Sequence, residues 1–120
     1  MAKRSHLNKA FLSECKKRLL EAKADILNRI NQNKDSLVFD GSHGDSADQS
    51  MRLVTENELV SLQMQWRKQL VEIENALSRV ENVTYGVCEE TEEPIELPRL
   101  RAIPWTRFSL EGAELRDPRH

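Results

Sequence analysis

The sequence is short of the residues that build a thick globular core. Aromatic residues make up 5% of its 120 positions, whereas charged residues make up 32% and apolar residues 38%. This balance is typical of long solvated helices that pack along one seam, and it argues against a deep apolar interior. The length suits a single domain, or one domain with a small appendage.

Long apolar runs and a strong net charge are also missing. No stretch approaches the ~18 apolar residues of a membrane span, and the N-terminus lacks the apolar stretch of a signal peptide. A formal net charge of −2 gives no overall attraction to nucleic acid, which would favour a basic surface. We therefore expect a soluble, cytoplasmic protein that binds neither membranes nor specific DNA sequences.

Reactive side chains are equally scarce. The two cysteines, Cys15 and Cys88, lie far apart in a chain with no sign of secretion, so we expect free thiols rather than a disulfide. The sequence has no Ser/His/Asp or Cys/His grouping, no phosphate-binding glycine loop and no metal-ligand cluster. We therefore expect that the protein is not an enzyme.

Two long segments with an apolar seam dominate what is present. The first runs from about residue 6 to 37, with apolar residues at intervals of three and four: Leu12, Cys15, Leu19, Ala22, Ile26 and Ile30. The second runs to residue 81 or 82 with a near-heptad seam: Leu59, Leu62 or Gln63, Trp66, Leu70, Ile73, Leu77 and Val80. These periods predict two helices, the first about 45 Å long. A short connection favours an antiparallel coiled-coil hairpin within one chain, and a coiled coil between chains is the alternative.

One Gly/Ser/Asp-rich break, at about residues 39–50, separates the two segments. Gly41 and Gly44 are able to adopt the positive φ angles that a reversal needs. Asp45 and Asp48 lie where the second helix should begin, and an Asp there caps free backbone N–H groups. The break is therefore predicted to be the tip of the hairpin.

The character of the sequence changes after the second helix. Residues 85–98 are acidic and punctuated by proline, residues 99–108 are basic with interleaved aromatics, and residues 109–120 suit a short helix that ends before Pro118. We predict a mainly α fold: a long antiparallel coiled-coil hairpin over residues 1–84, and a small module over residues 85–120 with turns, short strands and a short terminal helix.

Three motifs in this C-terminal part occur in a characteristic order. They are Tyr85–Gly–Val–Cys88, Glu93–Pro–Ile95 and Arg99–Leu–Arg–Ala–Ile–Pro104. In order and spacing they resemble the DksA/TraR family, bacterial regulators that bind RNA polymerase. The resemblance implies a coiled-coil hairpin that runs into a zinc-finger module, and it covers all but the ends of the chain.

The sequence departs from the family at the positions of the metal ligands. The four ligand positions of the family correspond here to Cys88, Thr91, Ser109 and Gly112. Structural zinc needs four nitrogen or sulfur ligands, and one thiolate does not supply them. We therefore expect no zinc and no other cofactor. Apolar residues should hold this degenerate zinc-finger-like module together instead: Tyr85, Val87, Ile95, Leu97, Leu100, Trp105 and Phe108.

The resemblance also implies the site residues. In the family, an Asp-x-x-Asp-x-Ala signature at the hairpin tip enters the secondary channel of RNA polymerase, and it corresponds here to Asp45, Asp48 and Ser50. The module contacts the polymerase rim, for which Arg99, Arg101 and Arg107 are the candidates. Three positions at which alarmone-responsive members carry basic residues are Glu72, Ile103 and Ala113 here, so we expect no ppGpp at that site.

The function that these patterns favour is regulation of transcription initiation, by a protein that is a monomer when free and has RNA polymerase as its partner. The alternative is a non-enzymatic coiled-coil adaptor or homodimer that has lost the polymerase role. The sequence does not distinguish inhibition from activation, and it does not indicate the target promoters.

Overall fold

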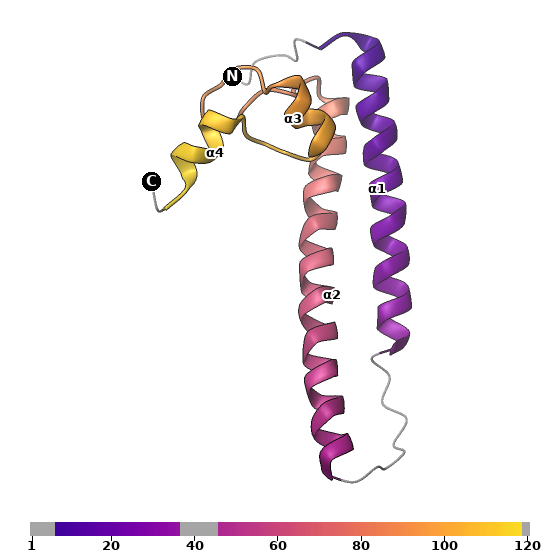
Figure 1. Cartoon of the computed structure of the whole chain (residues 1–120). Helices are drawn as coiled ribbons and strands as arrows, with labels where there is room; N and C mark the ends of the chain where they lie inside the picture. The colour runs from indigo at the N-terminus through magenta and orange to yellow at the C-terminus, as the bar shows by residue number, and fades with distance from the viewer. Residues whose placement is uncertain (1–6, 37–45, 119–120) are drawn as a thin grey trace. The chain divides into compact units, whose positions relative to one another are not determined.

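The computed structural model describes residues 7–36 and 46–118, with the backbone alone for residues 34–36 and 46–54. Within these residues it has four helices: α1 (Lys9–Ser36), α2 (Ser46–Glu81), α3 (Leu97–Ala102) and α4 (Leu110–Arg116) (Figure 1). The chain divides into two compact units. The first joins Met1–Lys23 to Val71–His120, and the second is Ala24–Leu70. No described helix is both long enough and apolar enough to cross a membrane.

The predicted mainly α fold, a helical coiled-coil pair with a small C-terminal module, is confirmed, with two differences in detail. α2 begins at Ser46, in agreement with the expected start near Asp45 or Asp48, but the predicted tip loop extended to residue 50, and residues 46–50 are helical. In the described part of the module, the predicted short strands amount to a single antiparallel bridge between Val87 and Pro94. Residues 97–102 form the additional short helix α3. The division of the chain at residue 84 stays a prediction.

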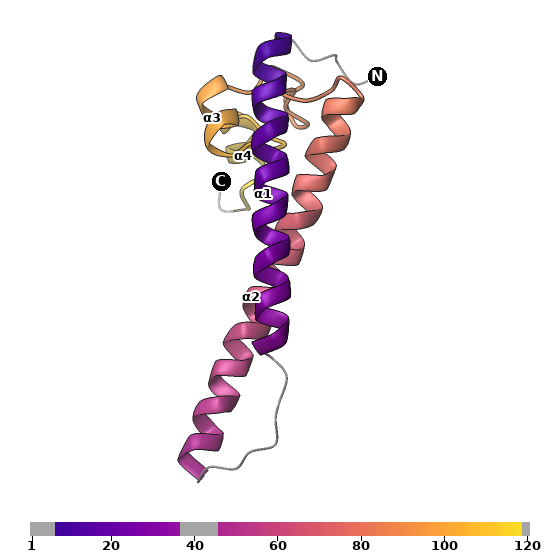
Figure 2. The same cartoon turned by 90° about the vertical axis from the view of Figure 1, so that its right-hand side faces the viewer.

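In the second unit, the end of α1 packs against α2, which runs in the opposite direction (Figure 2). Ile26 and Ile30 are buried on the predicted seam. Gln63, the polar residue of the α2 seam, is also buried, and its Nε2 donates a hydrogen bond of 2.7 Å to the Ile30 carbonyl. Its Oε1 accepts from Arg67 Nε at 3.2 Å. The buried amide is therefore satisfied at both ends, as a buried polar group must be to avoid a desolvation penalty.

In the first unit, the beginning of α1 packs against the end of α2. The Asn8 side chain accepts a hydrogen bond of 2.8 Å from Phe11 N and caps the start of α1. Cys15, Leu19 and Ile73 are buried on the predicted seam. Phe11 and Ala76 are buried where the seam was predicted to contain Leu12 and Leu77, which are half-buried. Cys15 is a free, buried thiol, and burial raises its pKa. It serves here as a small apolar side chain.

A tight turn connects α2 to the C-terminal module. The Arg79 carbonyl accepts hydrogen bonds from Thr84 N and Tyr85 N, and Val83 adopts a positive φ of 59°. This is the left-handed conformation in which a helix commonly ends. Gly86 follows with φ of 87°. This positive φ favours glycine, and a Cβ added there would lie 2.8 Å from Leu7 Cδ1, so the Leu7 side chain would have to shift.

Tyr85 anchors the module to the helical pair. Its side chain is completely buried, and its hydroxyl donates a hydrogen bond of 2.7 Å to the Pro104 carbonyl. Burial is the main cause that raises its pKa far above the usual value, with a contribution from the hydrogen bond with Cys15. The phenol therefore stays protonated and keeps its proton available for Pro104.

We predict that Tyr85→Phe destabilises the protein, because it leaves the Pro104 carbonyl without its buried donor. The expected loss is about 1–3 kcal/mol in the free energy of unfolding, measured by urea denaturation followed by circular dichroism. A free energy within about 0.5 kcal/mol of the unchanged protein, the range of neutral surface substitutions, would contradict this role.

Candidate functional site

The four positions that correspond to family zinc ligands lie together in the C-terminal module. Residues 86–95 fold back on themselves, because Ile95 N donates to the Gly86 carbonyl at 2.8 Å and Cys88 N donates to the Glu93 carbonyl at 2.9 Å. Glu92 N also donates a hydrogen bond of 2.9 Å to the Cys88 carbonyl. This loop brings Cys88 and Thr91 to the start of α4, where Ser109 and Gly112 lie.

Two of these positions carry hydroxyl groups that bind backbone N–H groups. Ser109 is the N-cap of α4, and its Oγ accepts a hydrogen bond of 3.1 Å from Gly112 N. Thr91 Oγ1 accepts from Glu93 N at 3.2 Å and closes the loop. Both are capping roles that Ser and Thr perform well.

Cys88 lies at the centre of this cluster and is completely buried. Thr91 N donates a hydrogen bond of 3.5 Å to its Sγ. Burial acts to raise the pKa of the thiol, but hydrogen bonds from the side chains and backbone of Ser109 and Thr91 outweigh it and lower the pKa to about 7. A Cβ added at Gly112 would overlap Cys88 Sγ. Glycine is therefore the residue that gives the sulfur its space.

A second set of hydrogen bonds holds residues 101–108, which we call the carbonyl-bound segment. Arg18 Nη1 donates to the Arg101 carbonyl at 2.8 Å, and Tyr85 binds the Pro104 carbonyl. Arg99 Nε and Thr106 Oγ1 both donate to the Phe108 carbonyl, at 2.8 and 3.0 Å. Most of this segment lies outside the helices, so these side chains supply donors to carbonyls that a regular element would satisfy itself.

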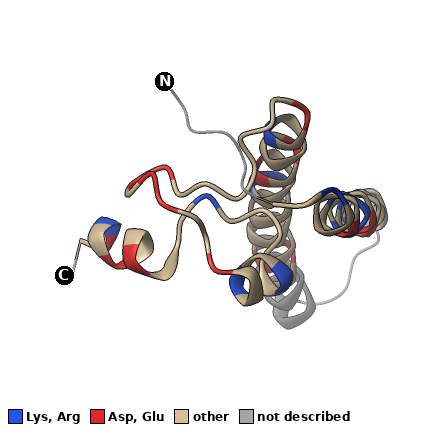
Figure 3. Cartoon of the chain, turned by 90° about the horizontal axis from the view of Figure 1, so that it is seen from above, with Lys and Arg blue, Asp and Glu red and all other residues tan. Residues whose placement is uncertain are grey.

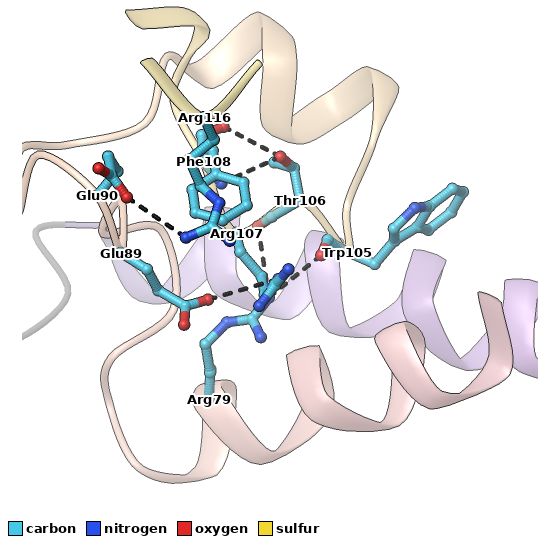
Figure 4. A network of polar contacts seen from close by, with 8 residues as sticks. All are labelled: Arg79, Glu89, Glu90, Trp105, Thr106, Arg107, Phe108 and Arg116. Carbon is cyan, nitrogen blue, oxygen red and sulfur yellow. Dashed lines mark hydrogen bonds and ion pairs between the residues drawn. The ribbon is translucent and has the colours of Figure 1, made fainter. Parts of the chain in front are cut away.

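Arg79, in the last turns of α2, makes the central contact of this set (Figure 4). Its Nη2 donates to the carbonyls of Trp105 and Thr106, at 3.2 and 3.3 Å. Burial lowers the pKa of the guanidinium, and nearby Glu89 opposes that shift. An arginine remains charged even so, so α2 presents a half-buried cation to two carbonyl oxygens of the carbonyl-bound segment.

The three arginines predicted to contact the polymerase rim all have partners within the chain. Arg99 is half-buried and structural, through its bond to Phe108. Arg101 is exposed, with its guanidinium carbon 5.3 Å from the centroid of the Phe11 ring. Arg107 lies 4.8 Å from the Phe108 ring centroid and 3.7 Å from a Glu89 carboxylate oxygen. Such exposed contacts are weak, so Arg101 and Arg107 remain available to a partner.

Some of the apolar residues predicted to hold the C-terminal module together are buried, and others are not. Tyr85, Ile95 and Leu100 are buried, whereas Leu97 is 41% exposed. Val87, Trp105 and Phe108 are half-buried. Phe108 lies beneath the guanidinium groups of Arg107 and Arg116, and Figure 4 shows the Trp105 side chain pointing away from the polar network.

The predicted tip residues are described less completely than the rim arginines. Asp45 lies outside the described residues. Asp48 and Ser50 lie in the first turns of α2, where the backbone alone is described. Their assignment to the tip stays a prediction.

Sequence reasoning missed Arg18 and Arg79. Both lie among many charged helical residues, and an arginine near a helix C-terminus is common because it interacts favourably with the helix dipole. The sequence carries no signal that separates a buried arginine of this kind from a solvated one.

Comparison with known proteins supports one family. The family model described as the prokaryotic dksA/traR C4-type zinc finger matches residues 83–116. The chain is 34% identical over 114 residues to the RNA polymerase-binding transcription factor DksA of Caulobacter vibrioides, covering 94% of this chain and 80% of that protein. The chain belongs to the DksA/TraR family.

Two further proteins are similar to most of the chain. An uncharacterized protein of Aquifex aeolicus is 39% identical over 112 residues, which is 90% of this chain and 77% of that protein. The structure of the transcription factor DksA2 from Pseudomonas aeruginosa matches with a TM-score of 0.83 and 28% identity, covering 95% of this chain and 88% of that one.

The zinc implied by a C4-type finger does not fit the residues present. Only Cys88 offers a thiolate, and the hydroxyl groups of Thr91 and Ser109 are engaged with backbone N–H groups. Gly112 has no side chain, and its backbone lies against the sulfur. Residues 7–36 and 46–118 show no group of three or more His, Cys, Asp or Glu side chains that could hold a metal ion. A tetrahedral zinc site requires four N, S or O ligands, which this arrangement does not supply.

We predict that Gly112→Ala destabilises the protein by about 1–3 kcal/mol, as overpacking usually does, because its Cβ overlaps Cys88 Sγ. In a Cys88→Ala background the same substitution should be close to neutral, since the sulfur is gone and alanine favours a helix over glycine. Urea denaturation of the two single variants and the double variant measures this double-mutant cycle. Equal costs in the two backgrounds would show that Gly112 does not make space for the sulfur.

Proposed function

We propose that this protein binds RNA polymerase and regulates transcription initiation by inserting the tip of its helical hairpin into the secondary channel of the enzyme. The observation that carries the proposal is its similarity over 94% of the chain to a DksA named for polymerase binding. The similarity to the DksA2 structure over 95% of the chain gives further support. A polymerase partner implies a cytoplasmic location.

The tip would act through carboxylates. Asp45 and Asp48 precede and begin α2, and Ser50 replaces the small final residue of the family signature. Carboxylates at the end of a narrow helical pair would reach into a channel that a globular protein is too wide to enter. Carboxylates bind basic side chains or the water shell of Mg²⁺. Contacts of this kind near the polymerase active site would alter the lifetime of promoter complexes.

The C-terminal module would contact the polymerase rim. Of the three arginines predicted for this contact, Arg101 and Arg107 are exposed and fit the role. Arg99 fits a supporting role, because its Nε donates to the Phe108 carbonyl. A single copy of the chain would bind each polymerase.

The proposed regulation does not depend on ppGpp. The three positions that carry basic residues in alarmone-responsive members hold Glu72, Ile103 and Ala113, which are half-buried. Without cations there, and with a carboxylate in their place, a polyphosphate has no charge-assisted donors.

We predict that Asp48→Asn abolishes the effect on promoter-complex lifetime and leaves polymerase affinity within about threefold of that of the unchanged protein, an estimate based on how little a single exposed charge contributes to binding. The amide keeps the shape and removes the charge. The measurements are the decay of competitor-resistant promoter complexes and the affinity for core polymerase.

Glu58→Gln, which removes an exposed carboxylate from α2 away from the tip, is the matched control and should behave as the unchanged protein. Full activity of Asp48→Asn would refute the tip mechanism. Absence of polymerase binding by the unchanged protein would refute the proposed function itself and favour the adaptor alternative.

A further inference from the structure

A groove of about 450 Å³ lies between α1 and α2 in the first unit. Lys16, Leu20 and Lys23 of α1 form one wall, and the other wall consists of α2 residues: Glu74, Leu77, Ser78 and Glu81. Leu20 is 49% exposed. The groove thus carries one leucine in each wall, between lysines on the α1 side and glutamates on the α2 side.

This groove lies on the side of both helices opposite to the C-terminal module. On α1, Arg18 reaches the module, and Lys16 and Leu20 are each two residues away, about 200° around the helix. On α2, Arg79 reaches the module, and Leu77 and Glu81 are likewise two residues away. The module therefore leaves the groove open to a partner.

The residues of the groove form three layers across the two helices. Lys16 Nζ and Glu81 Oε1 pair at 3.3 Å, which places these residues at the same level. Because the helices run in opposite directions with the same rise per residue, Leu20 lies level with Leu77. By the same count, Lys23 lies level with Glu74. A leucine layer is thus bounded by two layers that each contain one lysine and one glutamate.

We propose that this groove is a self-association surface, on which two copies of the chain pair through a two-fold axis parallel to the helices. In this parallel pairing, α1 of each copy faces α2 of the other, so each lysine wall meets a glutamate wall. Leu20 and Leu77 of both copies form a central layer of four leucines. Each outer layer becomes a ring of four alternating charges.

The charge pattern favours this pairing over the antiparallel one. If one copy were reversed, α1 would face α1, with Lys16 over the second copy's Lys23, and the glutamates of α2 would face each other as well. Like charges placed opposite one another are strongly unfavourable. A second copy is therefore the occupant that the groove itself specifies, because each copy carries both complementary walls. With one leucine layer the association is expected to be weak and reversible, so the free chain would be a monomer at low concentration, as expected from the sequence, and would pair only as its concentration rises.

Analytical ultracentrifugation of the full chain, from micromolar to millimolar concentration at low and high ionic strength, tests the proposal. A monomer–dimer equilibrium is expected that weakens as salt screens the charge rings. Leu20→Ser should weaken it, whereas Leu110→Ser, which removes an exposed leucine of the module, should leave it unchanged.

A charge exchange provides the sharper test. The acidic-face variant carries Lys16→Glu and Lys23→Glu, and the basic-face variant carries Glu74→Lys and Glu81→Lys. Each alone should lose at least roughly tenfold in self-association, because like charges then face each other. An equimolar mixture should form a heterodimer at least as tightly as the unchanged protein forms its dimer.

Circular dichroism of each variant verifies that it is folded. A protein that stays monomeric at every concentration would overturn the proposal. So would folded charge variants that keep their self-association, or a mixture that associates no better than either variant alone. None of these outcomes depends on RNA polymerase, so the self-association surface and the proposed function succeed or fail separately.

Discussion

The C-terminal module depends on one constraint: several backbone carbonyls of residues 101–108 take their hydrogen-bond donors from side chains outside this segment. The donors come from side chains of α1, α2 and the turn after α2, namely Arg18, Arg79 and Tyr85. The bond from Tyr85 is buried, where a carbonyl without a partner would be costly, that from Arg79 is partly buried and that from Arg18 is exposed. Because each donor comes from outside the segment, these bonds also tie the module to the helical pair. These contacts give the module a physical basis for a fixed structure that comes from the chain itself.

The positions that correspond to the family's zinc ligands fit the same pattern. Each has become part of a local hydrogen-bonded arrangement: Ser109 caps α4, Thr91 closes the loop and Gly112 makes space for a buried thiol. In a four-cysteine finger the metal supplies folding free energy, whereas here capping, packing and carbonyl binding supply it. A family member built in this way would keep its fold where zinc is scarce, and its module would still be available for contact with a partner.

The sequence predicted the helical pair and the family well, and the contacts that hold the module poorly. Apolar periodicity located Cys15, Leu19 and Ile73 because a seam repeats over many turns, and the resemblance to the family pointed to Thr91, Ser109 and Gly112. Short helix α3 was missed because six residues show no period and Pro98 interrupts the pattern. Arg79 was missed because burial of an arginine depends on where a distant loop lies. The role of Asp48 rests on its correspondence to the family signature.

Amide hydrogen exchange on protein freed of metal by a chelator tests the central claim most directly. The amides of Cys88, Ile95 and Gly112 report on the module, since each donates a hydrogen bond inside it. The account predicts that these amides are protected against exchange, and that adding zinc leaves their protection unchanged. Unprotected module amides beside protected α1 and α2 amides, with protection restored by zinc, would contradict it.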